Sequence, residues 1–236
     1  MFIQAVGLIV DWPDLTALWL SFKLASVTTI LLVLVTTPLA YWLSITRSKL
    51  KPLVETLVAL PIVLPPTVMG FYLLILLGPD GWLGSLWVKF TGSALTFSFT
   101  GLVIASIFYS LPFVVQPLQN GFESINPRLK EAAKSLGMKP IDVFFSVSIP
   151  LAKRAYLTAA VLGFAHTLGE FGVVLMVGGN IPGETKVIAI EIYNQVETLN
   201  YSQAHGLSAI LLLLAFFMIF LMYFFNHKSR YQTKIV

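Results

Sequence analysis

Two ionisable side chains stand close together in an otherwise apolar stretch, HTLGEFG at residues 166–172. A carboxylate deep in an apolar span costs roughly 2.5–3.5 kcal/mol, so Glu170 should face protein or water and have a polar partner. His166 lies four residues earlier and would share its face of a helix, while Gly169 and Gly172 would allow close helix approach. Three interpretations stay open: an internal ion pair that fixes packing or a gate, a polar site facing a passage, and metal or proton-relay chemistry. One His and one Glu are too few ligands for a metal site within one chain.

Other reactive residues are sparse. The chain has no cysteine, and its three histidines, His166, His205 and His227, lie on distant segments without H-E-x-x-H spacing. No G-x-x-x-x-G-K-[ST] phosphate loop is present, so the chain has no ATP-binding loop of its own. We therefore expect a non-catalytic chain without a cofactor or metal, and an intramembrane enzyme is a minor alternative.

The composition indicates which solvent the chain occupies. A mean hydropathy of +0.84, with 57% hydrophobic and 11% charged residues, makes the chain too apolar to cover a soluble surface. We expect an all-α integral membrane protein. A spanning helix needs about 20 mainly apolar residues, and five stretches qualify: 15–43, 53–77, 97–118, 155–177 and 207–225. Residues 1–13 contain no Lys or Arg, so no removable signal peptide is predicted.

Basic residues predict the orientation. All of the 15 Lys and Arg residues except Lys23, Lys89 and Lys186 fall in the loop 44–52, the loop 123–154 or the tail after residue 225. The positive-inside rule places these segments in the cytoplasm, with the N-terminus outside and the C-terminus inside. This placement explains the net charge of +4 without nucleic-acid binding. We expect one membrane domain, residues 1–236, in the plasma (inner) membrane, with a cytoplasmic loop 123–154 and an extracytoplasmic loop 179–203.

The second predicted span is rich in proline. It reads LPIVLPPTVMGFYLL at residues 60–74, and each proline removes a backbone donor inside the membrane. One interpretation is a half-helix that begins near Pro66, with Pro65, Pro66 and Thr67 at its tip, whose amides and positive dipole end could attract an anion. The other interpretation is a plain kink that aids packing.

The loop 123–154 carries the signals of two short helices. Asn126 can cap a helix that has Pro127 at its first position, and Gly137 suits a left-handed helix end. A second helix would run from about Pro140 to Pro150. Physical chemistry alone leaves two roles open, a surface for a partner protein and an amphipathic hairpin on the membrane. The residues that could form such a partner surface are Glu131, Ala132, Ala133, Lys134, Gly137 and Pro150.

The spacing E-A-A-x-x-x-G at residues 131–137, with V-S-I-P at 147–150, resembles the coupling motif of ABC importer permeases. The resemblance implies the type I importer helix bundle, with five predicted spans here although family members can have six. It further implies that two cytoplasmic ATPase subunits, which bind ATP and Mg, dock on this loop in a permease homodimer. Glu131 would pair with a basic ATPase side chain, and the spans would alternate between inward and outward access.

Three further motifs, LP-x-x-LPP at 60–66, GEFG at 169–172 and NIPGET at 180–185, are similar to molybdate permeases over about residues 15–225. This similarity implies oxyanion import, with molybdate delivered by an extracytoplasmic binding protein. Tungstate or sulfate/thiosulfate is the alternative cargo, and ion-coupled secondary transport is a less favoured mechanism. The family usually has arginine where this chain has His166.

Two sets of residues could contact the binding protein or the anion. Spans two to five carry no Lys or Arg in their interiors, so tight binding is expected in the separate binding protein rather than in the passage. Candidate contacts with that protein are Asn180, Glu184 and Lys186, together with Glu191 and Glu197. Candidate hydroxyl contacts along the passage are Ser26, Thr29, Ser106, Ser110 and Thr167.

Overall fold

The computed structural model describes residues 15–232, and the side chains as far as Asn226. Every regular element in this range is helical, which confirms the all-α prediction. The predicted absence of a signal peptide and the outside position of the N-terminus concern residues that lie outside the described range, as does Lys234 of the tail.

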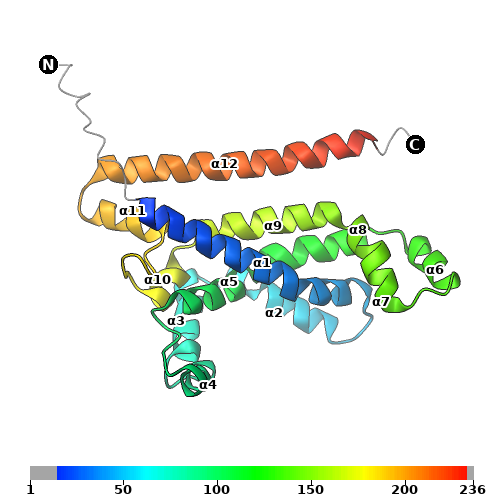
Figure 1. The fold of residues 1–236 in the computed structure, drawn as a ribbon, viewed down its shortest axis with the longest axis horizontal. Helices are drawn as coiled ribbons and strands as arrows, with labels where there is room; N and C mark the ends of the chain where they lie inside the picture. Colours follow the sequence, from blue (N-terminus) through cyan, green and yellow to red (C-terminus); the bar gives the residue numbers. More distant parts are fainter. Residues whose placement is uncertain (1–14, 233–236) are drawn as a thin grey trace. The chain divides into compact units, whose positions relative to one another are not determined.

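The chain groups into two compact units. Unit 1 comprises Met1–Val27, Pro65–Ser106 and Thr167–Phe217, and unit 2 comprises Thr28–Leu64, Ile107–His166 and Met218–Val236. Each unit is discontinuous along the chain because the long helices α1, α5, α9 and α12 contribute residues to both (Figure 1).

Within residues 15–232, three helices are long and apolar enough to cross a membrane alone: α1 (Leu15–Ile45), α5 (Phe99–Glu123) and α12 (Tyr201–Gln232). Two further helix pairs are apolar and long enough only when each pair is taken together. Helices α2 (Lys51–Val63) and α3 (Pro66–Leu77) meet at a bend of 115°, and α9 (Lys153–Leu168) and α10 (Gly172–Gly178) at a bend of 62°. Counting each bent pair as one span gives up to five spans in residues 15–232, so the number of five stays a prediction.

Proline causes the first interruption. Leu64 and Pro65 each precede a proline, whose ring disfavours the helical conformation of the residue before it. Both residues are accordingly extended, with ψ of 136° and 138°. The half-helix predicted near Pro66 is confirmed, because α3 begins there. By contrast, α5 continues as one helix through Pro112 and Pro117.

Unit 2 has a core of apolar and aromatic side chains. Leu43, Val114, Leu118 and Phe122 are fully buried within it. Glycine allows two close helix contacts: a Cβ on Gly163 would lie 2.6 Å from Val114 Cγ2, and a Cβ on Gly121 would lie 2.1 Å from the Cβ of Ala155. Both contacts join α5 to α9. The loop 123–154, hereafter the central loop, contains α6 (Pro127–Ser135), α7 (Pro140–Val143) and α8 (Ile149–Leu151).

In unit 1, α3 packs against α10. A Cβ on Gly172 would lie 2.7 Å from Pro66 Cβ, and one on Gly70 would lie 2.8 Å from Met176 Cβ. Small residues therefore permit the two half-helices to meet. The unit also contains α4 (Trp82–Thr91) and α11 (Ile188–Glu197), and the Ser21 hydroxyl of α1 accepts the N–H of Ile188 at 2.7 Å.

Candidate functional site

The first helix of the central loop has well-defined ends. The Asn126 side chain accepts the N–H of Arg128 at 3.0 Å, which satisfies one of the free donors at the start of α6. At the other end Gly137 has φ +85°, and its N–H donates to Lys134 O while Met138 N donates to Ala133 O. This pair of bonds is the Schellman arrangement, which favours glycine at the left-handed position. The predicted cap and glycine turn are both confirmed.

The second helix of the central loop begins at Pro140, as predicted, and ends at Leu151. A π-helical turn, Phe144–Ser148, lies within it. The Phe144 ring lies 4.6 Å from the Tyr41 ring, and Tyr41 in turn lies 5.3 Å from Phe122 (centroid distances). The central loop is thereby packed against both α1 and α5.

Lys130 also connects α6 to α1. Its ammonium group lies 5.5 Å from the centroid of the Tyr41 ring, within the range of a cation–π contact. Burial lowers the pKa of Lys130 below its usual value, and the positive charge of Lys134 lowers it further. The inner face of α6 is thus attached to the helix bundle.

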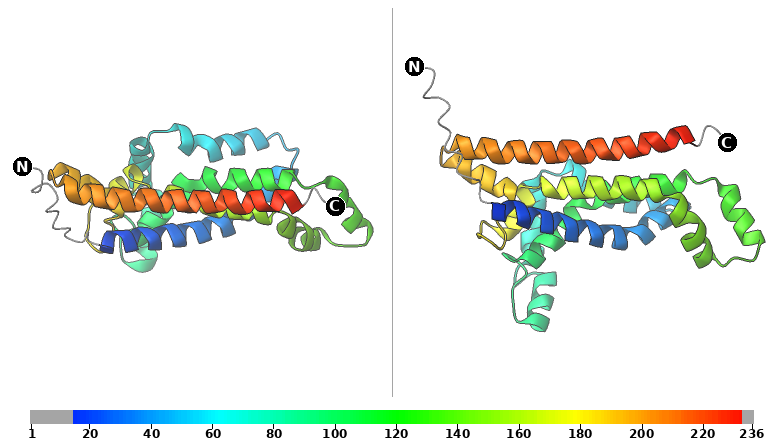
Figure 2. Two further views of the ribbon diagram at one scale, coloured as in Figure 1. Left: turned by 90° about the horizontal axis from the view of Figure 1, so that it is seen from above. Right: turned by 45° about the horizontal axis from the view of Figure 1, so that its top comes forward.

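The outer face of the central loop remains uncovered in the single chain. Of the residues expected on the partner surface, Glu131, Ala132 and Lys134 are exposed, whereas Ala133 is only 7% exposed in the single chain. Pro150 is exposed as well. In Figures 1 and 2, α6 lies beyond the ends of α5 and α9 within unit 2. Large apolar side chains accompany these residues on the exposed surface: Leu129, Leu136, Ile141 and Phe145.

The tip of α3 offers less to an anion than the sequence suggests. Pro65, Pro66 and Thr67 are all exposed. However, Pro66 has no N–H, and the N–H groups of Val68 and Met69 both donate to Pro65 O, at 3.0 and 3.1 Å. The half-helix retains its dipole, but most of its free donors are already satisfied.

His166 and Glu170 do not share a helix face, so the argument from their four-residue spacing is wrong. Helix α9 ends at Leu168, and Glu170 lies in the interruption before α10, next to the exposed Gly169. His166 Nδ1 is 2.8 Å from the Ser110 hydroxyl, and its ring stacks on Phe113 with centroids 3.9 Å apart. His166 therefore joins α9 to α5 through a hydrogen bond and ring stacking.

Glu170 is buried, with 3% of its surface exposed. Among the described residues neither carboxylate oxygen has a hydrogen-bond partner, although the Ser106 hydroxyl lies close enough to interact with the carboxylate. No group of three or more His, Cys, Asp or Glu side chains suited to a metal ion occurs in the described part of the chain.

Most of the hydroxyls expected along a passage are buried inside the chain. Thr29, Ser106, Ser110 and Thr167 are each at most 7% exposed, and Ser26 is half-buried. The four buried hydroxyls do not face an open passage in this conformation, because their own chain covers them. A hydroxyl in an apolar span can either line a pore or support helix packing, and the sequence pattern is the same in both cases.

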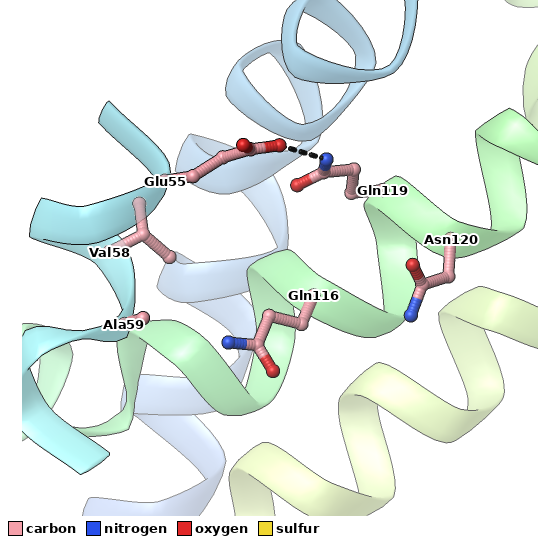
Figure 3. A pocket seen from close by; sticks show the side chains of 6 residues that line it. All are labelled: Glu55, Val58, Ala59, Gln116, Gln119 and Asn120. Carbon is pink, nitrogen blue, oxygen red and sulfur yellow. Dashed lines mark hydrogen bonds between the residues drawn. The ribbon is translucent and has the colours of Figure 1, made fainter. Parts of the chain in front are cut away.

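A pocket of about 320 Å³, which was not predicted from the sequence, lies between α2 and α5. One water needs only about 15 Å³ by this measure, so the pocket can hold several waters or a small hydrated ion. Figure 3 shows Glu55 of α2 and Gln119 of α5 reaching toward each other, and Gln119 donates to Glu55 Oε1 at 2.7 Å. Lys51 Nζ lies 3.6 Å from Glu55 Oε1 and 3.2 Å from Glu123 Oε1. The pocket is lined by Glu55, Val58, Ala59, Gln116, Gln119 and Asn120.

A sequence signal for this pocket exists. Gln116, Gln119 and Asn120 are spaced i, i+3 and i+4 in an otherwise apolar span, which places three amides on one helix face. Gln116 and Asn120 are exposed in the single chain. Such a face is costly against lipid, so it is expected to face water or protein.

The loop 179–203, hereafter the outer loop, contains α11. Paired polar side chains hold the segment before α11 to this helix. Asn180 and Asn194 exchange two amide hydrogen bonds, at 3.0 and 3.2 Å. Lys186 Nζ lies 2.7 Å from Glu191 Oε2, and both side chains are largely buried. Lys186 and Glu191 are therefore used inside the loop rather than as free docking charges, whereas Glu184 is exposed. Helix α11, Ile188–Glu197, lies close to the short helix predicted for residues 186–195.

Comparisons with known proteins agree with this architecture. The family model described as "Binding-protein-dependent transport system inner membrane component" matches residues 33–231. "Molybdenum transport system permease protein ModB" of Azotobacter vinelandii is 55% identical over 211 residues, which cover 89% of this chain and 93% of that protein. A putative molybdenum transport system permease protein, YvgM of Bacillus subtilis (strain 168), is 34% identical over 87% of this chain and 90% of its own.

A solved structure supports the fold at lower sequence identity. A chain of a bacterial alginate ABC transporter, crystallised with an alginate pentasaccharide-bound periplasmic protein, aligns with a TM-score of 0.72 and 19% identity. The alignment covers 99% of this chain and 84% of that one.

Proposed function

Because the chain belongs to the family of binding-protein-dependent transport system inner membrane components, we propose that it is the permease subunit of an ATP-driven molybdate importer. The assignment of molybdate as the transported anion rests on the 55% identity to the Azotobacter vinelandii molybdenum permease over nearly the full length of both chains. Tungstate is the closest alternative, because it is a tetrahedral oxyanion of the same charge and nearly the same size, whereas sulfate is smaller. Sulfate is less favoured, since both relatives described above are molybdenum permeases.

Energy would enter through the central loop. Its Schellman turn and packing on Tyr41 and Phe122 make it a rigid projection, and its uncovered face combines Glu131 and Lys134 with large apolar side chains. Such a mixed face suits a protein partner. We assign this face to an ABC ATPase subunit, which would bind ATP and Mg, while this chain itself performs no catalysis.

A second copy of the chain would complete the passage. One central loop per chain seats one ATPase, so a two-fold homodimer with two ATPases is the economical assembly. The two compact units share four continuous helices, and we take residues 1–236 as one permease domain. The amide face of α5, with the exposed Gln116 and Asn120, then supplies polar contacts along the passage near the central loop.

The orientation follows from the basic residues. Arg47, Lys49 and the basic residues of the central loop would lie in the cytoplasm of a multi-pass inner-membrane protein. The N-terminus would be outside and the C-terminus inside. The outer loop would then meet an extracytoplasmic oxyanion-binding protein, with Glu184 and Asn180 as contacts.

The test is uptake of radiolabelled molybdate into proteoliposomes that contain the permease, its ATPase and the binding protein. Uptake should require ATP and all three proteins, and unlabelled tungstate should compete far better than sulfate. Sulfate competing as well as molybdate would reassign the cargo. Glu131→Lys should abolish ATP-dependent uptake and ATPase association, with Glu131→Gln as the neutral control; normal uptake by Glu131→Lys would contradict the role of the central loop.

A further inference from the structure

Helix α4 presents an apolar face that the transport function does not use. Trp82, Leu86 and Phe90 follow one another at four-residue spacing, so they lie on one side of the helix. They are 73%, 41% and 88% exposed. Figures 1 and 2 show α4 extending from the end of α3, away from α10 and α11 of the same unit.

The junction between α3 and α4 is closely packed. A Cβ on Gly84 would lie 1.9 Å from Gly78 O, and one on Gly81 would lie 2.1 Å from Ile75 O. Gly81 N also donates to Gly78 O at 2.9 Å. Because these backbone approaches exclude any side chain, the junction holds α4 at a fixed angle on the end of α3.

The C-terminal end of α4 forms hydrogen bonds within its own helix. The N–H of Gly92, whose φ is +73°, donates to Val88 O at 2.8 Å, and the Thr91 hydroxyl donates to Trp87 O at 2.9 Å. The charged group of the helix is Lys89, which is exposed near its C-terminal end. The helix thus combines a hydrogen-bonded C-terminal end, bulky aromatic side chains and one positive charge.

We propose that α4 lies in the interfacial layer of the bilayer, where it follows the end of α3. Chain connectivity keeps it at that level, because it joins the end of the α2–α3 span to the start of α5. Tryptophan is enriched at the membrane interface, and apolar faces of interfacial helices insert about 5–10 Å into the headgroup and acyl boundary. Trp82, Leu86 and Phe90 enter that layer, while Lys89 contacts anionic lipid phosphates.

The lipid contact gives α4 a mechanical role that does not depend on the cargo. Helix α3 is attached to α4 at one end and begins at the Pro66 interruption at the other. It also packs on α10 through Gly70 and Gly172. An interfacial α4 therefore fixes the level of the α3–α10 pair in the membrane.

The chain has no cysteine, so single-cysteine variants of the full protein can report this position directly. Phe90→Cys is labelled with an environment-sensitive fluorophore in nanodiscs of mixed zwitterionic and anionic lipid. Leu212→Cys on the exposed face of α12 is the lipid reference, and Glu184→Cys on the outer loop is the water reference. Thermal melting checks that each variant is folded.

The label at residue 90 should be quenched by nitroxides near the lipid headgroups, at a depth of about 5–10 Å. Aqueous iodide should quench it several-fold less than the label at residue 184. Adding Lys89→Glu should move the label toward water as the anionic lipid fraction rises. Iodide quenching equal to that at residue 184 would overturn the proposal, and so would shielding from both quenchers, which would mean that a second protein copy covers α4.

Discussion

The contact between Gly121 of α5 and Ala155 of α9 predicts a pair of substitutions that compensate each other beside the central loop. A Cβ on Gly121 would lie 2.1 Å from the Cβ of Ala155, and the next nearest atom, the Cα of Ala155, lies at 3.6 Å. Carbon atoms pack at about 3.5–4.0 Å. Gly121→Ala therefore forces the two helices apart by about 1.4 Å, whereas Ala155→Gly removes only the obstructing atom.

The magnitudes follow from packing and helix propensity. Overpacking in Gly121→Ala lowers the free energy of unfolding by about 1–3 kcal/mol. The higher helix propensity of alanine raises it by about 1 kcal/mol, which offsets part of that loss. Ala155→Gly alone loses about the same propensity term. In the double variant the propensity terms cancel, and the new Cβ meets the Cα of Ala155 at an ordinary distance. The interaction energy of the cycle is therefore about 1–3 kcal/mol in favour of the double variant.

The measurement is the free energy of unfolding in mixed micelles for the parent, both single variants and the double variant, with ATP-dependent uptake measured beside it. The double variant should recover both stability and uptake. Purely additive effects, with an interaction energy below about 0.5 kcal/mol, would refute the close approach of α5 and α9. Recovered stability without recovered uptake would instead separate packing from transmission between the central loop and the spans.

Three further substitutions test the remaining parts of the site. Gly137→Ala puts a side chain at φ +85° where no atom lies within 4 Å, so the cost is conformational, about 1–2 kcal/mol; ATPase affinity should fall by up to about 5–30-fold, and Gly137→Asn should lose less. Lys186→Met leaves the buried Glu191 carboxylate without its counter-charge, with the Gln195 amide still donating to Oε1 at 2.6 Å; stability should fall by up to about 3–5 kcal/mol in thermal melts, while adding Glu191→Leu should restore most of it. Gln119→Leu removes the donor to Glu55 and should cost only about 1 kcal/mol of stability, but uptake should fall clearly if the pocket belongs to the passage; unchanged uptake would exclude that role.

The central loop could be predicted from sequence because its signals are local. Asn126 caps its own helix, Gly137 adopts a conformation that glycine favours, and Pro140 starts the next helix. Each depends on the backbone of a few neighbouring residues, so tertiary contacts do not change it. The interruption before Pro66 is local in the same sense, because two consecutive prolines disfavour a helix.

The surroundings of Glu170 could not be predicted in this way. No proline marks the interruption between α9 and α10, and Gly172 at the start of α10 packs on Pro66, more than a hundred positions away in the sequence. A helix assumed to continue past residue 168 therefore placed His166 and Glu170 wrongly on one face. The burial of Glu191 was missed for a similar reason, since a charged residue in a loop reads as exposed until its partner Lys186 is placed beside it.

In the proposed function, α5 is the helix through which movement of the central loop would reach the passage. It ends where the central loop begins, and Phe122 beside that end packs on Tyr41 of α1. One turn earlier lie the amides of the pocket, and further along the helix Ser110 and Phe113 hold His166 of α9. Closely packed helices move together rather than deform, so a displacement of the central loop must shift the amide face of α5 together with α9. In the proposed function, a passage lined by amides instead of fixed cations would bind an anion only weakly, so the same shift would release it into the cytoplasm.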